Sequence, residues 1–231
     1  MGTGNAAQLS AAAAVQPPAT PLSRRVALCE IGCLLLCMEL IMWLVPLMPG
    51  ARAAYAGLAV LIVVLLAVTH LRDGATAREL GFRFDNFLPA LGWVGARLAP
   101  FVAVILLVGA ATHSLRFGGR FYGMLLTVPL WALLQQYMLF VFVHRRLRVV
   151  LGEGRRAVFV TAALFALLHL PNPMLTLACA IAGTVWARAY ERTPNLFANA
   201  VTHTVASALL ANSLPHWLLK NMVVGTNHFF R

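Results

Sequence analysis

The residues best suited to chemistry in this chain are a few polar side chains inside long apolar runs. Gln135 and Gln136 are adjacent in one run, His169 ends another, and His203 lies in a third. Strongly polar groups are costly in lipid, so they usually face a protein interior or a cavity. Imidazole can serve as acid, base or metal ligand near neutral pH, and an amide can orient water or donate to an oxyanion. The four residues therefore indicate one enclosed site.

The four-residue spacing of a helix places further residues on the same helix faces as the two histidines. Polar residues of the last apolar run recur every four positions, which places them on one face of a helix: Asn195, Asn199, His203 and Ser207. Phe165 precedes His169 by the same step on an earlier run. We expect Phe165, Asn199 and Ser207 to support the site that the histidines form.

Several chemistries fit two imidazoles in a membrane. They could ligate haem, bind a divalent metal or act in acid–base catalysis. Haem favours two histidines at matching depth, whereas His169 is expected near the end of its run and His203 near the middle of its own. Two imidazoles without a nearby acid do not make a tight zinc site, so no metal ligand set is predicted. Bis-histidine haem or metal binding is the remotest alternative.

Peptide hydrolysis would need a base that activates water and donors that stabilise the oxyanion. Either histidine could supply either function. The missing part is a carboxylate, because only Glu30 and Glu39 of the 7 acidic residues fall inside apolar runs. Glu39 is the deeper of the two and is the candidate carboxylate, with Arg97 as a candidate partner for it.

The elements that must position these residues are transmembrane helices. The chain is 61% apolar and 11% charged over 231 residues, against about 45–50% and about 25% in soluble domains. This composition excludes a soluble globular domain, a disordered chain and a disulfide scaffold, and predicts an all-α polytopic bundle. A span needs about 20 mostly apolar residues. About seven runs are assigned as spans: 26–46, 52–69, 89–111, 121–143, 157–170, 173–188 and 195–213.

The chain divides into three parts on this interpretation. Residues 1–25 are expected to form a disordered cytoplasmic lead, residues 26–213 one transmembrane domain, and residues 214–231 an interfacial helix, a tail or part of an eighth span. Most of the 18 Lys and Arg residues then fall on the side of the N-terminus, which is cytoplasmic by the positive-inside rule. The net charge of +11 therefore needs no nucleic-acid partner. The basic cytoplasmic loop 144–156 is expected to contact anionic lipid.

The polar residues together resemble the motifs of the CPBP family, the CAAX-protease and bacteriocin-processing (Abi-type) group of membrane proteases. That family has Glu-Glu-x-x-x-Arg, Phe-x-x-x-His and His-x-x-x-Asn or Asp on successive helices. Phe165 to His169 fits the second motif completely. His203 fits the third motif, with Ser207 in place of Asn. The resemblance covers about residues 75–212.

The first motif departs from the family pattern. Gln135 and Gln136 stand at the two Glu positions, and Phe140 stands at the Arg position. The resemblance implies that the first-motif Glu activates the attacking water while the histidines help to hold water and oxyanion. A neutral amide cannot take a proton from water. The absence of the motif's Arg is consistent with the absence of its two Glu residues. Without those carboxylates, an arginine at this position would be a buried charge without a partner.

The resemblance implies an intramembrane endopeptidase that hydrolyses a membrane-embedded or lipid-anchored peptide or protein. The basic bias of the cytoplasmic side and the lack of a recognisable signal peptide favour a bacterial plasma membrane. In one version His203 or His169 is the base, and Gln135, Gln136 and Ser207 position water and the oxyanion. In another, Glu39 supplies the carboxylate. The main alternative is a catalytically inactive member that binds or scaffolds a membrane peptide or protein.

Overall fold

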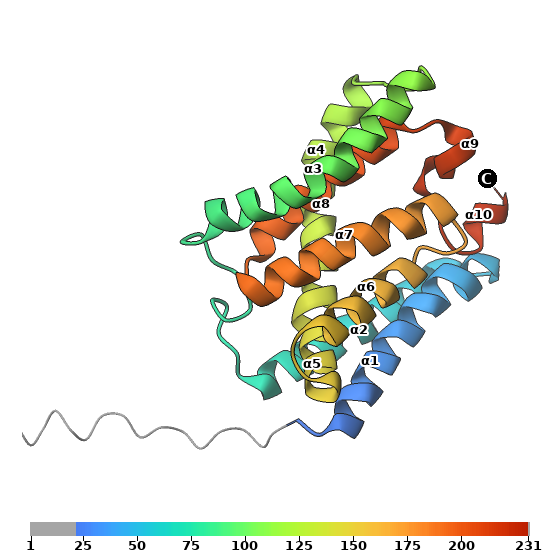
Figure 1. Cartoon of the computed structure of the whole chain (residues 1–231). Coiled ribbons are helices and arrows are strands. Elements are labelled where there is room, and N and C mark those ends of the chain that lie inside the picture. Colours follow the sequence, from blue (N-terminus) through green and yellow to red (C-terminus); the bar gives the residue numbers. More distant parts are fainter. Residues whose placement is uncertain (1–21, 231) are drawn as a thin grey trace, which may run out of the picture.

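The computed structural model describes residues 22–230. Residues 1–21 of the expected lead, and Arg231, lie outside the described residues, whereas Arg24 and Arg25 already belong to the first helix. Residues 22–230 form helices joined by turns and irregular chain, without a strand (Figure 1). The prediction of an all-α chain is confirmed.

Every predicted span coincides with a helix. The helices are α1 (Arg24–Glu39), α2 (Ala51–Asp73), α3 (Phe87–Ala111), α4 (Gly119–Gln136), α5 (Arg145–Leu151), α6 (Arg155–Leu167), α7 (Pro173–Arg192), α8 (Leu196–Ser213), α9 (His216–Leu219) and α10 (Asn227–Phe230). A π-helical segment, Leu40–Leu44, and a 3-10 turn, Val45–Leu47, extend α1. A second π-helical segment, Tyr137–His144, joins α4 to α5 without a break.

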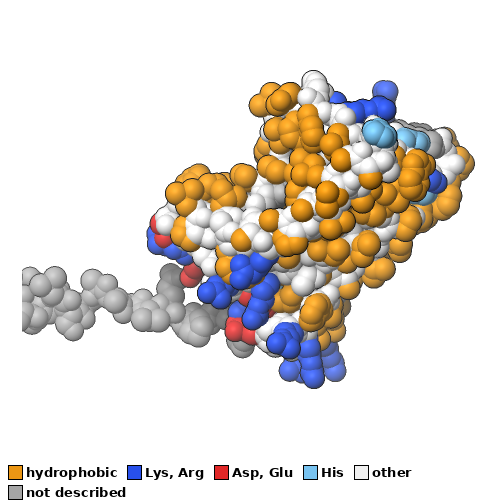
Figure 2. Space-filling model, turned by 45° about the horizontal axis from the view of Figure 1, so that its top comes forward, with side chains coloured by type: hydrophobic (Ala, Val, Ile, Leu, Met, Phe, Trp, Pro, Cys, Tyr) orange, Lys and Arg blue, Asp and Glu red, His pale blue; other side chains and the backbone are white. Residues whose placement is uncertain are grey.

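Within residues 22–230, four helical stretches are long and apolar enough to cross a membrane: Arg24–Leu47, Ala51–Asp73, Phe87–Ala111 and Gly119–Leu151. Large apolar side chains of these stretches stay exposed, among them Val63, Leu107 and Leu126. Figure 2 shows hydrophobic side chains over much of the surface, with most of the visible Lys and Arg in the lower part of the view. Such a surface suits lipid rather than water. The full count of seven spans and the cytoplasmic N-terminus stay predictions.

Two regions differ from the sequence-based expectation. The predicted loop 144–156 is mostly helix, because α5 continues the preceding stretch and turns Arg146 and Leu147 into the protein. The tail contains only two four-residue helices, α9 and α10, joined by a 3-10 turn and irregular chain. Each is far too short for the roughly 20 residues that a span requires. An eighth span is therefore wrong for residues 214–230.

The segment from Tyr137 to Leu147 lies between two apolar cores. Phe140 belongs to the larger core, which α3, α6, α7 and α8 build, and Phe142 belongs to the smaller core, which α1 and α2 build. Every residue from Met138 to His144 is buried as a result. In Figure 1, α7 lies between α8 and α6, while α1 and α2 cover the lower side. Gln136, just before this segment, is fully buried, whereas Gln135 is half-buried.

An ion-pair cluster fastens α1, α2 and α5 to one another. Arg146 donates from Nε to Glu30 Oε2 at 2.5 Å and from Nη2 to Asp73 Oδ2 at 3.3 Å. Arg72 also pairs with Glu30 and with Asp73. The Arg146 side chain is 3% exposed, against 41% for Arg72. We call these four residues the Glu30 cluster.

The chain after α8 returns to the rest of the fold and closes one end of it. Asn172, in the turn between α6 and α7, caps α7 by accepting from Leu175 N–H and donates to the Leu219 carbonyl at 2.7 Å. Gly225 N–H donates to the Leu170 carbonyl, and Thr226 N–H donates to the Met42 carbonyl. Residues 219–226 are therefore held between the end of α1 and the α6–α7 turn.

Candidate active site

A cavity of about 390 Å³ lies among the helices and is mostly apolar. Its lining comes from α1, α3, α4, α6, α7 and α8, together with Met222 and Val224 of the C-terminal segment. Apart from one cysteine, the polar side chains of the lining are four: Gln135, His169, His203 and Ser207. Sequence reasoning selected all four, and the structure brings them to one space from α4, the end of α6 and α8.

Gln136 lies beside the cavity wall and reaches His203. Its Nε2 is 3.0 Å from His203 Nδ1, and the Gln136 side chain is fully buried. An amide NH₂ group can only donate, so Nδ1 of His203 accepts and carries no proton. The proton of the neutral ring is then on Nε2. Gln136 therefore sets the tautomer of His203 and makes its Nε2–H a hydrogen-bond donor.

His169 has the opposite tautomer. Its Nδ1 is 2.6 Å from the Phe165 carbonyl oxygen, which can only accept. Nδ1 therefore carries the proton, and Nε2 keeps a free lone pair. The neutral His169 ring is a proton acceptor at Nε2, whereas the His203 ring is a donor there.

Phe165 fixes the relative positions of the two imidazoles. Its ring packs edge-to-face against His169, at 4.8 Å between centroids, and against His203, at 6.1 Å. The helix that contains Phe165 can approach α7 closely because of Gly183. A Cβ at Gly183 would meet Cα of Ala162 and Cδ1 of Phe165, each at 3.3 Å.

Trp186 also packs against His203 and was missed by sequence reasoning. The indole packs on the imidazole at 4.7 Å between centroids, and its Nε1 donates to Thr202 Oγ1 at 3.0 Å. A buried tryptophan on a helix of small residues is the signal that could have found it. Its packing partner, however, follows only from the pairing of α7 with α8.

Of the four polar residues on this face of α8, two make hydrogen bonds within the fold and two line the cavity. Asn195 is the N-cap of the helix and accepts from Ala198 N–H at 2.8 Å. Asn199 is buried and donates to the Trp186 carbonyl at 3.4 Å. His203 and Ser207, one and two turns further on, line the cavity. Asn199 thus supports the site through the backbone of Trp186.

Phe140 occupies the first-motif Arg position with an aromatic core. It is fully buried, stacks on Tyr190 at 5.4 Å between centroids, and lies next to His144. Tyr190 in turn donates from its hydroxyl to the Leu80 carbonyl at 3.0 Å. Gln135, Gln136 and Phe140 are all uncharged, and the carboxylate of Glu191 reaches the cluster at His144 Nε2, 3.5 Å away.

Glu39 lies away from the cavity lining. It is half-buried, and within residues 22–230 it forms no ion pair. Its suggested pairing with Arg97 is wrong. Arg97 lies over the Trp93 ring at 3.7 Å and donates to the Trp93 carbonyl at 3.1 Å. The guanidinium finds an aromatic face on its own helix instead of a carboxylate.

The donor set of the cavity does not fit a catalytic zinc. Such a site uses three protein ligands, and the described part of the chain has no group of three His, Cys, Asp or Glu placed to hold one ion. The cavity offers only two imidazoles, both packed edge-to-face against the Phe165 ring, among the residues that the structure describes.

The fold and the site define an integral membrane protein with a polar site enclosed among its helices. The chain matches the family model described as "Type II CAAX prenyl endopeptidase Rce1-like" over residues 32–209, and it belongs to this family. The resemblance to the CAAX-protease family is thereby confirmed, and the match begins nearer the N-terminus than the motifs alone indicated. No curated protein and no solved structure matches the chain.

Proposed function

We propose that this protein is an intramembrane endopeptidase that hydrolyses a peptide bond of a membrane-associated substrate in the 390 Å³ cavity. The observation that supports this most is the meeting of Gln135, His169, His203 and Ser207 in an otherwise apolar space. Peptide hydrolysis needs a base near the water and donors near the carbonyl oxygen. The opposite tautomers of the two histidines provide one of each.

The first step uses the lone pair of His169. Nε2 takes a proton from a water molecule that Gln135 orients, and the water oxygen attacks the carbonyl carbon of the substrate. The carbonyl π bond breaks, and its electrons move to the oxygen. Phe165 supports this step, since its carbonyl keeps the His169 proton on Nδ1. The imidazolium that forms holds the proton for the next step.

The second step uses the donors on α8. The negative oxygen accepts from His203 Nε2–H and from the Ser207 hydroxyl, which lowers the energy of the tetrahedral intermediate. The bond from carbon to nitrogen then breaks, and the leaving amine takes the proton from His169 Nε2. Gln136 acts through His203, because its amide keeps the donor proton at Nε2.

The apolar lining supports a substrate with an apolar anchor. Met38, Trp131 and Leu164 are among the residues that extend the cavity away from the polar group. A membrane-embedded or lipid-anchored peptide could seat its apolar part there and present its peptide bond to the histidines. We place this activity in a bacterial plasma membrane, with seven spans, a cytoplasmic N-terminus and basic cytoplasmic segments on anionic lipid.

Cleavage assays on the purified full chain in detergent test the proposal. The probes are a farnesylated peptide ending in a CAAX sequence and a set of unmodified transmembrane peptides, with products identified by mass spectrometry. We expect His203→Ala and His169→Ala to lower the rate by about a hundredfold or more. His70→Ala, which removes a histidine outside the cavity, is the matched control. Full activity in both cavity variants would refute the assignment.

A second candidate function is substrate binding without hydrolysis. It is favoured by Gln135, an amide where a carboxylate would be the base, and by Phe140, which is uncharged at the Arg position of the first motif. Gln135→Glu separates the two candidates. If the native chain is silent and this variant gains cleavage that His203→Ala then removes, the protein is a binder with a degenerate site. Cleavage by the native chain that is lost in His203→Ala supports the endopeptidase.

A further inference from the structure

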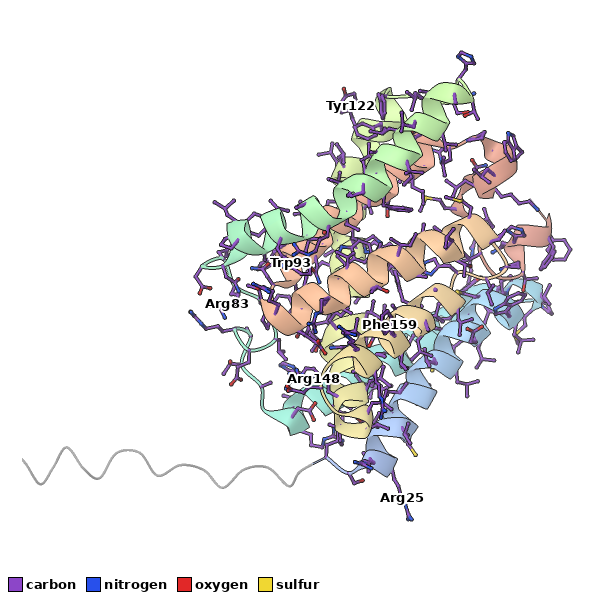
Figure 3. The ribbon with its side chains drawn as sticks, viewed as in Figure 1. Arg25, Arg83, Trp93, Tyr122, Arg148 and Phe159 are labelled. Atoms are coloured by element: carbon purple, nitrogen blue, oxygen red, sulfur yellow. The ribbon has the colours of Figure 1, made fainter. Side chains whose placement is uncertain are left out.

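A second cavity, of about 440 Å³, lies at the end of the molecule where α3 leads into α4. Its walls come from the α3–α4 connection, the last residues of α8 and the chain through α9. The chemically distinctive residues of the lining are basic or amide side chains: Arg116, Arg120, Asn212, His216 and Asn221. Tyr122, close to this cavity in sequence, lies at the opposite end of the molecule from Arg25 (Figure 3). The cavity is separate from the one that contains His203.

The basic residues of this second cavity have no acidic partner. All 7 acidic residues of the chain lie elsewhere in the sequence, and none lines the cavity. Most of the acids are already paired with arginines near the α2–α3 and α5–α6 connections: Glu30, Asp73, Asp85, Glu153 and Glu191. Within residues 22–230, Arg116 and Arg120 form no ion pair and no side-chain hydrogen bond. Two unpaired guanidinium groups on one concave surface favour an anion.

Backbone donors at the start of α4 add to this preference. Gly118 is the N-cap and contributes no side chain, so the first amides of the helix have no capping group. In the described part of the chain, N–H groups of Gly119 and Arg120 donate to no other backbone or side-chain acceptor. Such amides at the N-terminus of an 18-residue helix attract negative charge. The arginines are therefore joined by donors that need an external acceptor.

The surroundings indicate that the anion comes from the membrane. Phe117, Phe121 and Tyr122 form a chain of edge-to-face contacts beside the cavity, with 5.2 Å and 5.4 Å between successive centroids. Tyr122 and, across the cavity on α9, Trp217 are 60% and 71% exposed. Aromatic residues of this kind gather at the headgroup level of a bilayer. Leu214 and Leu219 give the cavity apolar walls as well.

We propose that this cavity binds the phosphate of an anionic membrane phospholipid. Arg116 and Arg120 would contact the phosphate oxygens, the α4 amides would assist, and the aromatic residues would lie against the glycerol and upper acyl region. The site is independent of the proposed peptidase activity. It also differs from the expected lipid contacts of residues 144–156, which lie at the other end of the molecule.

Native mass spectrometry of the full chain, titrated with dioleoylphosphatidylglycerol in detergent, tests this site. The variant is Arg116→Gln with Arg120→Gln. The matched control is Arg24→Gln with Arg25→Gln, which removes the same charge from two exposed arginines of α1 that form no ion pair within residues 22–230. We expect the tightest bound lipid to weaken by about tenfold in the first variant and to change little in the control. Inorganic phosphate at millimolar concentration is expected not to displace that lipid.

Three results would overturn the proposal. Equal weakening in both double variants would mean that only general electrostatic attraction operates. Full displacement by inorganic phosphate would mean that the ligand is a free anion. Unchanged lipid binding in the Arg116 and Arg120 variant would remove the site altogether. An unchanged melting temperature checks that each variant is folded, and Arg116→Lys, which keeps the charge, is expected to retain most of the binding.

Discussion

The Glu30 cluster and the cavity that contains His203 both hold polar side chains inside an apolar protein, but they differ in how completely those side chains are hydrogen-bonded. In the cluster every buried polar atom has a partner: Arg146 alone reaches Glu30, Asp73 and the Phe142 carbonyl. Beside the cavity, Gln136 donates to His203, but its Oε1 is buried without a hydrogen-bond partner in the described part of the chain. The hydrogen-bonding groups of the cluster are therefore paired with one another, whereas the cavity side chains keep donors and acceptors without partners in residues 22–230.

The polar residues of the cluster hold helices together, whereas the polar residues of the cavity are available to a substrate. Paired charges that join three helices fix the position of α1, which forms one wall of the cavity. The uncharged polar groups of the cavity avoid the large cost of burying an ion, and they leave His169 Nε2 and His203 Nε2–H free for a substrate. Substitutions in the cluster should therefore change stability, and substitutions in the cavity should change activity.

The largest expected effect is in the cluster. Arg146→Met leaves Glu30 and Asp73 partly buried with one arginine between them, and should lower the free energy of unfolding by about 3 kcal/mol. Arg72→Met is the matched control, since Arg72 is 41% exposed and should cost less than about 1 kcal/mol. The measurement is unfolding in detergent micelles followed by circular dichroism. Equal losses in the two variants would contradict the distinction between buried and exposed partners.

A smaller effect, on rate alone, is expected beside the cavity. Gln136→Met keeps the shape of the side chain but removes the donor to His203, and should lower cleavage about tenfold, since a lost hydrogen bond costs about 1–2 kcal/mol. Gln136→Glu sharpens the test, because a carboxylate accepts from Nδ1–H and moves the proton of His203 away from Nε2. Cleavage should fall in this variant too. A rise would show that His203, rather than His169, is the base.

The smallest effect is expected outside the membrane, in the α2–α3 connection. Arg83, with a contribution from Arg78, lowers the pKa of Asp85 to about 2 from the ordinary 3.8. A lowered pKa means that the charged carboxylate stabilises the fold above about pH 3.8 and that this contribution is lost as the pH falls toward about 2. Asp85→Asn should therefore lower the melting temperature slightly at neutral pH and by much less at about pH 2. A difference that is equal at both pH values would contradict the ion pair.

The apolar runs of the sequence predicted the positions of the helices, but not the residues at which the helices end. The run 121–143 continues as helix to Leu151, because Leu147 is buried and Arg146 finds two carboxylates. In a sequence, an arginine-rich stretch after an apolar run looks like a loop, since its partners are distant in the chain. Glu30 and Arg146 are 116 residues apart.

In the candidate site, too, the sequence could not predict which distant residues a side chain contacts. Spacing alone placed Asn195, Asn199, His203 and Ser207 on one face of α8. It could not show that the first is a helix cap, that the second holds the Trp186 backbone, and that only the last two reach the cavity. The sequence could not predict the role of Trp186, because a ring contact between two helices, such as that of Trp186 with His203, produces no regular spacing of residues.

The return of the chain after α8 has a consequence for how the site comes into being. Met222 and Val224 are the last of the cavity's lining residues to be synthesised, and residues 225 and 226 attach them to Leu170 and Met42. Proteins are made from the N-terminus onward, so α1 and the histidine-bearing helices exist before this piece does. A nascent chain that stops before Met222 has both imidazoles but lacks one wall around them. The site is therefore complete only once residues 222–226 have been added and packed.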